Sequence, residues 1–182
     1  MKSGVCFLAS ILLGVGPASA RLGESPDECE KRYGRATATA LNLGEELKED
    51  GAGWKASTYV TRGLEIQVIF DDGKAVMVRY ANQPMFSMGS APSSTVNLSA
   101  GEIDQLKKAN AEGAVWKPYS VRVLTKVAPG MKVWRTGDSD VFAGYNRESR
   151  QLFVCTSEFW DLVLERVRDR YEAGVDKRLE GL

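Results

Sequence analysis

The sequence predicts an α+β fold, in which an antiparallel sheet of about five or six strands carries two or three helices packed on one face. Two patterns along the 182 residues indicate this fold. Segments in which apolar and polar residues alternate follow one another through short links, and short links favour antiparallel neighbours. Other segments begin with a serine or threonine that can cap a helix and continue with apolar residues at helical spacing.

Residues 63–80 are the clearest strand pair and predict a β-hairpin around the turn Asp71–Lys74. The alternating apolar residues on the two sides of this turn are Leu64, Ile66, Val68, Phe70, Val76, Val78 and Tyr80. Gly73 can adopt the positive φ that a short hairpin turn requires, and Asp72 tolerates it better than most residues. We expect Phe70 to be buried and Asp72 to be exposed.

Further strands are predicted from shorter patterns on both sides of this hairpin. They lie at 58–61, with a bend or bulge at Gly63, and at 120–127, 132–135, 140–145 and 151–156. The polar, glycine-rich segment 44–53 predicts a surface loop, and segment 82–95, which contains two prolines, predicts a connector.

Three segments carry helix signals. Ser25 and Glu28 form a predicted capping box with Pro26 at the first helical position, and Gly34 ends that helix. Ser99 and Glu102 form a second capping box, for a helix that ends at Gly113. The last helix begins at Thr156 or Ser157 and places on one stripe Phe159, Leu162, Val163, Val167 and Tyr171. We expect a single domain at 21–174 and a frayed tail at 175–182.

The first twenty residues predict a secretory signal peptide. Lys2 precedes an apolar run from Val5 to Val15, and Ala18-Ser19-Ala20 offers the small residues that signal peptidase requires. The run is short for a membrane span. We therefore expect cleavage between Ala20 and Arg21 and a soluble product in the periplasm or outside the cell. The processed chain has nearly balanced charge, which argues against nucleic-acid binding, and we expect no stable membrane insertion.

Two cysteines, Cys29 and Cys155, remain after the predicted cleavage. In an oxidising compartment they can form one disulfide, which would close a long loop and stabilise the fold by about 5 kcal/mol in the chain-entropy model. The alternative is two separate buried thiols that act as small apolar residues. Spacing along the chain does not decide between the two.

The segment from Gly23 to Gly34, followed by Leu64 to Lys74, resembles the start of SmpA/OmlA-type and β-lactamase-inhibitor-protein-like domains. These small exported α+β domains place a short capped helix, which ends at a glycine, before a meander of strands. The resemblance implies a fold that holds protein partners and carries no catalytic apparatus. Arg35-Ala36 stands where a proline is usual, and the lipidated cysteine of the SmpA/OmlA proteins is missing. The chain is also similar to small exported bacterial proteins of unknown function.

The sequence contains no histidine, the commonest general base and metal ligand. Ser139 in Gly137-Asp138-Ser139 therefore lacks the usual activating partner, and a turn explains that tripeptide. Asp138 and Asp140 are too few oxygen ligands for a calcium loop. We assign no catalytic, cofactor-binding or metal-binding residue, and we expect no cofactor.

The remaining candidates for a site are large apolar residues beside loops. Trp54, Met85 and Met88 are the predicted surface-binding residues, because an exposed aromatic or methionine is typical of a contact site. The hypothesis from the sequence is an exported, non-catalytic binding or envelope-support protein whose partner is another envelope or secreted protein. The alternative is a carboxylate-dependent hydrolase that acts on cell-wall or extracellular glycan, since paired carboxylates need no histidine.

Overall fold

The structure is a computed structural model, and it describes residues 21–39, 53–83, 97–111 and 113–179. The predicted leader at 1–20, most of the glycine-rich loop at 44–53, and Met85 and Met88 lie outside these residues. Predictions about them stay predictions.

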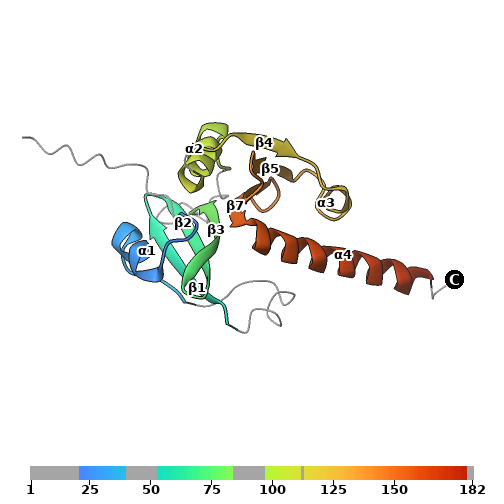
Figure 1. The fold of residues 1–182 in the computed structure, drawn as a ribbon, viewed down its shortest axis with the longest axis horizontal. Coiled ribbons are helices and arrows are strands. Elements are labelled where there is room, and N and C mark those ends of the chain that lie inside the picture. Colours follow the sequence, from blue (N-terminus) through green and yellow to red (C-terminus); the bar gives the residue numbers. More distant parts are fainter. Residues whose placement is uncertain (1–20, 40–52, 84–96, 112, 180–182) are drawn as a thin grey trace, which may run out of the picture.

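Blocks of strands follow single helices along the chain (Figure 1). The elements in order are α1 (Pro26–Tyr33), β1 (Lys55–Thr61), β2 (Leu64–Asp71), β3 (Lys74–Asn82), α2 (Ala100–Asn110), β4 (Trp116–Tyr119), α3 (Arg122–Val127), β5 (Lys132–Thr136), β6 (Val141–Asn146), β7 (Gln151–Thr156) and α4 (Ser157–Leu179).

Seven strands join one antiparallel sheet in the order β1-β2-β3-β7-β6-β5-β4. The α+β class and the antiparallel sheet are therefore confirmed, but the expected count of about five or six strands is too low. The prediction of a strand at 120–127 is also wrong, because the helix α3 occupies most of this segment. The spacing of Val121 and Leu124 suits a helical turn as well as a strand, and the structure buries Leu124 in a cluster with α4 residues.

The predicted hairpin is confirmed in β2 and β3. Its turn residues Asp72 and Gly73 have φ values of 46° and 74°, as a two-residue turn between twisted strands requires. Phe70 is only 2% exposed, and Asp72 is exposed. The predicted alternation fails at Val76. The pairing register shifts beside Phe70, and Val76 therefore lies on the opposite face of the sheet from Val78.

Helices cover both faces of the sheet, so the prediction that they pack on one face is wrong. On the first face, which we call the α1/α2 face, Cys29 and Tyr33 of α1 and Ile103 and Leu106 of α2 pack on inward residues of the strands. On the second face, which we call the α3/α4 face, helix residues Leu124, Phe159 and Trp160 pack on the strand side chains that point away from the α1/α2 face. The central strands carry apolar residues at successive positions, such as Val68, Ile69 and Phe70, and therefore need cover on both sides.

The two halves of the fold repeat one arrangement. A capped helix precedes a three-strand meander in α1-β1-β2-β3, and α2 precedes the meander β5-β6-β7, with β4 and α3 inserted between them. The last strands of the two meanders, β3 and β7, pair antiparallel at the centre of the sheet. Both capping boxes are present, at Ser25 with Glu28 and at Ser99 with Glu102. The two halves thus share the order of a capped helix and a meander, and α1 and α2 lie on the same face of the sheet.

α4 continues directly from β7 and runs away from the sheet (Figure 1). Its stripe begins at the buried Phe159 and continues through half-buried Leu162, Val163, Val167 and Tyr171, as predicted. The helix extends to Leu179, so it includes most of the segment predicted as a frayed tail. Among the described residues, no helix is long and apolar enough to cross a membrane.

Cys29 and Cys155 are free, buried thiols. Cys29 belongs to the cluster on the α1/α2 face and Cys155 to the cluster on the α3/α4 face, so the sheet separates them. The disulfide is therefore not formed in this structure, and the alternative of two separate buried thiols is the one observed. Burial raises the pKa of the Cys29 thiol to about 12 and also raises the pKa of Cys155.

We predict that neither thiol reacts in the folded, processed chain near about pH 8, because burial blocks access and suppresses the thiolate that attacks alkylating reagents. Mass spectrometry after iodoacetamide treatment should show unmodified Cys29 and Cys155 in the native protein. Unfolding in denaturant without a reductant should then give complete labelling of both. A mature chain that labels only after reduction would mean that the two cysteines are bonded.

We also predict that Gly144→Ala destabilises the fold by about 2 kcal/mol. A Cβ at Gly144 would lie 2.2 Å from Cζ of Phe153 on the paired strand β7, and the Phe153 ring is itself stacked on Trp160. Urea unfolding measures the change. Gly101→Ala is the matched control, since no atom lies within 4 Å of a Cβ there and the residue is helical. Equal stability of the two variants would contradict the packing described for Phe153.

Candidate functional site

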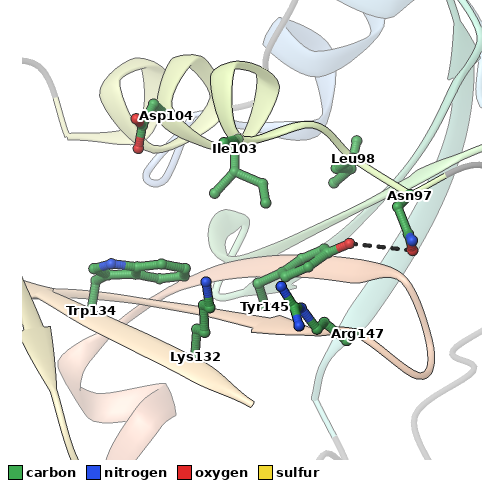
Figure 2. Close-up of a pocket in the computed structure, with 9 residues that line it drawn as sticks. Asn97, Leu98, Ile103, Asp104, Lys132, Trp134, Tyr145 and Arg147 are labelled. Atoms are coloured by element: carbon green, nitrogen blue, oxygen red, sulfur yellow. Dashed lines mark hydrogen bonds between the residues drawn. The ribbon is translucent and has the colours of Figure 1, made fainter. Parts of the chain in front are cut away.

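A cleft of about 400 Å³ opens between α2 and the sheet at β5 and β6 (Figure 2). The residues that line it are Asn97, Leu98, Ala100, Ile103, Asp104, Lys132, Trp134, Tyr145 and Arg147. This volume lies in the range that small ligands or a few side chains of a partner occupy. The cleft combines an apolar floor with several polar groups, which is the usual composition of a binding site.

The capping box at the start of α2 places one wall of the cleft. The Ser99 hydroxyl accepts a hydrogen bond from the Glu102 backbone, and the Glu102 carboxylate accepts one from the Ser99 backbone at 2.7 Å. The helix therefore begins at Ala100, and Ile103 and Asp104 follow one turn later. Figure 2 shows Ile103 pointing from the helix into the cleft.

Strand alternation and pairing place the opposite wall. Lys132 and Trp134 lie two residues apart on β5 and therefore share one face of the sheet. Lys132 is paired directly with Tyr145 of β6, so these two side chains are cross-strand neighbours. The Tyr145 ring is 5% exposed, and its hydroxyl donates a long hydrogen bond of 3.5 Å to Oδ1 of Asn97 (Figure 2).

A buried lysine of α2 contacts residues of both walls. The Lys107 side chain is 7% exposed, and its Nζ lies 3.0 Å from Oδ1 of Asp104. The same Nζ lies 4.3 Å from the ring centre of Trp134 and 5.8 Å from that of Trp116. Contacts of a cation with aromatic faces and with a carboxylate together offset the cost of burying the ammonium group. Asp104 is therefore already engaged in an ion pair.

Lys132 and Arg147 are the other charged residues of the cleft, and both are cations. Within the described part of the chain, neither has a carboxylate oxygen within 4 Å. The cleft thus presents two positive charges that no acid on its own walls compensates.

The predicted binding residue Trp54 lies at a second hollow, of about 350 Å³, on the α3/α4 face. Its ring is half-buried and packs against Phe159, with 5.1 Å between the ring centres. The aromatic surface of Trp54 therefore contributes to the core, and a role in binding stays a prediction. The structure does not bring Trp54 to the cleft beneath α2.

The second hollow also brings two carboxylates together, Asp71 and Glu158. Hydrogen bonds from the backbone N–H of Glu158 itself and from the Thr156 hydroxyl hold the pKa of the Glu158 carboxyl below its usual range. A general acid requires the opposite shift, a pKa raised towards neutrality. The direction of this shift does not suit Glu158 to the role of general acid.

The tripeptide Gly137-Asp138-Ser139 and the neighbouring Asp140 lie in the link between β5 and β6. The backbone N–H of Ser139 donates to the Thr136 carbonyl, and that of Asp140 donates to Oδ1 of Asp138. Hydrogen bonds from the Thr136 hydroxyl and from the backbone N–H of Asp140 lower the pKa of the Asp138 carboxyl. Across the described ranges of the chain, no group of three acidic or cysteine side chains is placed to hold a metal ion.

Sequence reasoning missed the cleft because its residues come from separate segments. Asn97 and Ile103 belong to the α2 region, Lys132 and Trp134 to β5, and Arg147 to the link after β6. A weak local signal exists, since Lys132 and Trp134 share a strand face. Nothing in the linear sequence indicates that α2 lies opposite that face.

No family model matches the chain, and comparison with curated proteins finds no match. Among solved structures, the chain is similar to a cysteine-rich secretory protein from Staphylococcus aureus, with 11% sequence identity and a TM-score of 0.41. The match covers 76% of this chain and 44% of that protein, so the chain spans less than half of its length. A likeness this distant assigns no family and no function.

We predict that the aliphatic part of the Lys107 side chain contributes more to the stability of the fold than its charge does. Lys107→Met keeps a long side chain between the two indoles and leaves Asp104 largely exposed to water, so unfolding in urea should change by less than about 1 kcal/mol. Lys107→Ala leaves a void and should cost about 2 kcal/mol. If the methionine variant loses as much stability as the alanine variant, the ammonium group carries the interaction instead.

Proposed function

We propose that this protein is an exported, non-catalytic binding protein and that the cleft beneath α2 is where it holds its partner. The observation that carries this proposal is the composition of the cleft, an apolar floor with a buried tyrosine and two cations without a carboxylate partner on the described walls. Such a site offers complementarity to a ligand, and it offers no nucleophile paired with a base.

Export is part of the proposal and is supported by the N-terminal sequence. Lys2, the apolar run that follows it and Ala18-Ser19-Ala20 form the pattern of a cleaved leader. The partner is then another envelope or secreted protein. The proposed resemblance to SmpA/OmlA-type and β-lactamase-inhibitor-protein-like domains agrees with this role, and the order of α1 followed by β1, β2 and β3 supports it.

The carboxylate-dependent hydrolase remains the second candidate because Asp71 and Glu158 share a hollow. The lowered pKa of the Glu158 carboxyl argues against Glu158 as the general acid of such a pair. A screen of the processed chain against glycan substrates, with Glu158→Gln as control, tests it directly. Turnover that the glutamine variant abolishes would favour the hydrolase over the binding protein.

We predict that Ala100→Trp abolishes partner binding, because Ala100 is an exposed residue that lines the cleft and an indole there would fill it without changing any charge. The processed chain and the variant are immobilised and exposed to envelope extract, and the bound proteins are quantified by mass spectrometry. The partner should fall by about tenfold or more, which corresponds to about 1.4 kcal/mol of binding free energy.

Ala173→Trp is the matched control, because Ala173 is an exposed helical residue of α4, which packs on the opposite face of the sheet. It should retain the partner at the level of the unaltered chain. Equal capture by the two tryptophan variants and the unaltered chain would show that the cleft is not the binding site.

A further inference from the structure

The charge of the cleft identifies the chemistry of its ligand. Lys132 and Arg147 extend from the sheet side, and Figure 2 shows their nitrogen ends turned towards the cleft beside the Tyr145 ring. Asp104 is the single acidic residue among the lining residues, and its carboxylate is 3.0 Å from Nζ of the buried Lys107. Because the acid on the wall already has a cation of its own, an incoming anion meets two positive charges that the described walls leave uncompensated.

The geometry of an arginine beside a lysine favours a planar anion. The guanidinium group of Arg147 presents paired N–H donors that match the two oxygens of a carboxylate, and the ammonium group of Lys132 adds a compact charge. Both side chains are exposed at the cleft, so they can approach a ligand without first breaking an ion pair within the described part of the chain.

The floor of the cleft identifies what is attached to the anion. Leu98 and Ile103 are buried aliphatic residues, with 4% and 8% of their surfaces exposed. The small surface that they expose is aliphatic, and the exposed Ala100 and the half-buried Trp134 add further apolar surface to the cleft. This surface suits an aliphatic or aromatic side chain, which loses contact with water when it packs there. A cleft lined by these residues therefore takes a ligand that is apolar beside its charge.

Some of the polar groups that a sugar would use are already engaged within the protein. Oδ1 of Asn97 accepts from the Tyr145 hydroxyl, Asp104 pairs with Lys107, and Nζ of Lys107 lies 4.3 Å from the ring centre of Trp134. A sugar ring carries many hydroxyls, and each that is buried without a partner costs free energy. The walls thus favour a peptide over a glycan.

We propose that this cleft binds a peptide carboxylate that is flanked by an apolar side chain and belongs to the protein partner. The carboxylate contacts Arg147 and Lys132, and the neighbouring side chain packs on Leu98 and Ile103. The inference rests on the proposed function, since it names the ligand of the same cleft. The carboxylate comes either from a chain end or from an acidic side chain, and the experiment separates these sources.

The test uses three synthetic peptides and the processed chain labelled with ¹⁵N. The first peptide ends in phenylalanine with a free carboxylate, the second is the same peptide with an amidated end, and the third is amidated and contains an internal Leu-Glu pair. Binding is followed by the shift of the Trp134 indole N–H signal, which is assigned with Trp134→Phe. Inorganic phosphate and an anionic polysaccharide are titrated separately.

We expect the first or the third peptide to bind and shift the Trp134 signal, and the neutral second peptide to bind at least about tenfold more weakly. Binding by the first identifies a chain end, and binding by the third identifies an acidic side chain. Lys132→Gln/Arg147→Gln should raise the dissociation constant of the bound peptide by about tenfold or more. Lys31→Gln/Arg35→Gln, a matched pair at exposed positions in and just after α1, should leave it unchanged.

Three results would overturn the carboxylate inference. The first is equal binding of the neutral peptide, and the second is a dissociation constant that the Lys132→Gln/Arg147→Gln variant does not alter. The third is binding of phosphate or polysaccharide without binding of any peptide. If Ala100→Trp still abolishes capture of the partner in that case, the cleft remains the binding site and only its ligand class is wrong. If Ala100→Trp leaves capture intact, the proposed function itself fails.

Discussion

The pairing of β3 with β7 is the contact on which the rest of the structure depends. Val78 is paired with Val154 and Tyr80 with Leu152, and all four side chains are fully buried. Without this pairing, each half would be a separate meander with an open edge at β3 or β7. The pairing joins the meanders into one sheet. A buried hydrogen bond of 2.9 Å from Nδ2 of Asn110 in α2 to the Tyr80 hydroxyl in β3 crosses the same seam.

The two faces of the joined sheet then take different roles. On the α3/α4 face, the Trp160 ring of α4 stacks on the Phe142 ring of β6, with 5.2 Å between the ring centres. On the α1/α2 face, α1 packs over the first meander, whereas α2 lies over the second and leaves the cleft open beside β5 and β6. The two halves thus differ at the candidate site, where Lys132 and Arg147 meet the apolar floor.

Local patterns predicted much of the fold because they depend on neighbouring residues. The turn at Asp72-Gly73 and both serine capping boxes are set by backbone conformation and by contacts three residues apart, so the sequence shows them directly. The strand prediction at 120–127 is wrong because Val121 and Leu124 suit a helical turn as well as a strand, and packing with α4 decides between them. The loop setting of Trp54 predicts an exposed ring, but the contact with Phe159 that half-buries it is remote in sequence.

The sequence by itself determined the α+β class, the first hairpin, and the capped starts of α1 and α2, since each follows from hydrogen bonding and steric preference within a few residues. Only the tertiary structure decided which strands meet at the centre, that helices cover both faces, and that Cys29 and Cys155 lie on opposite sides of the sheet. The cleft belongs to this second group. Its cations and its apolar floor come from distant segments, and their meeting is a consequence of strand pairing that no local pattern encodes.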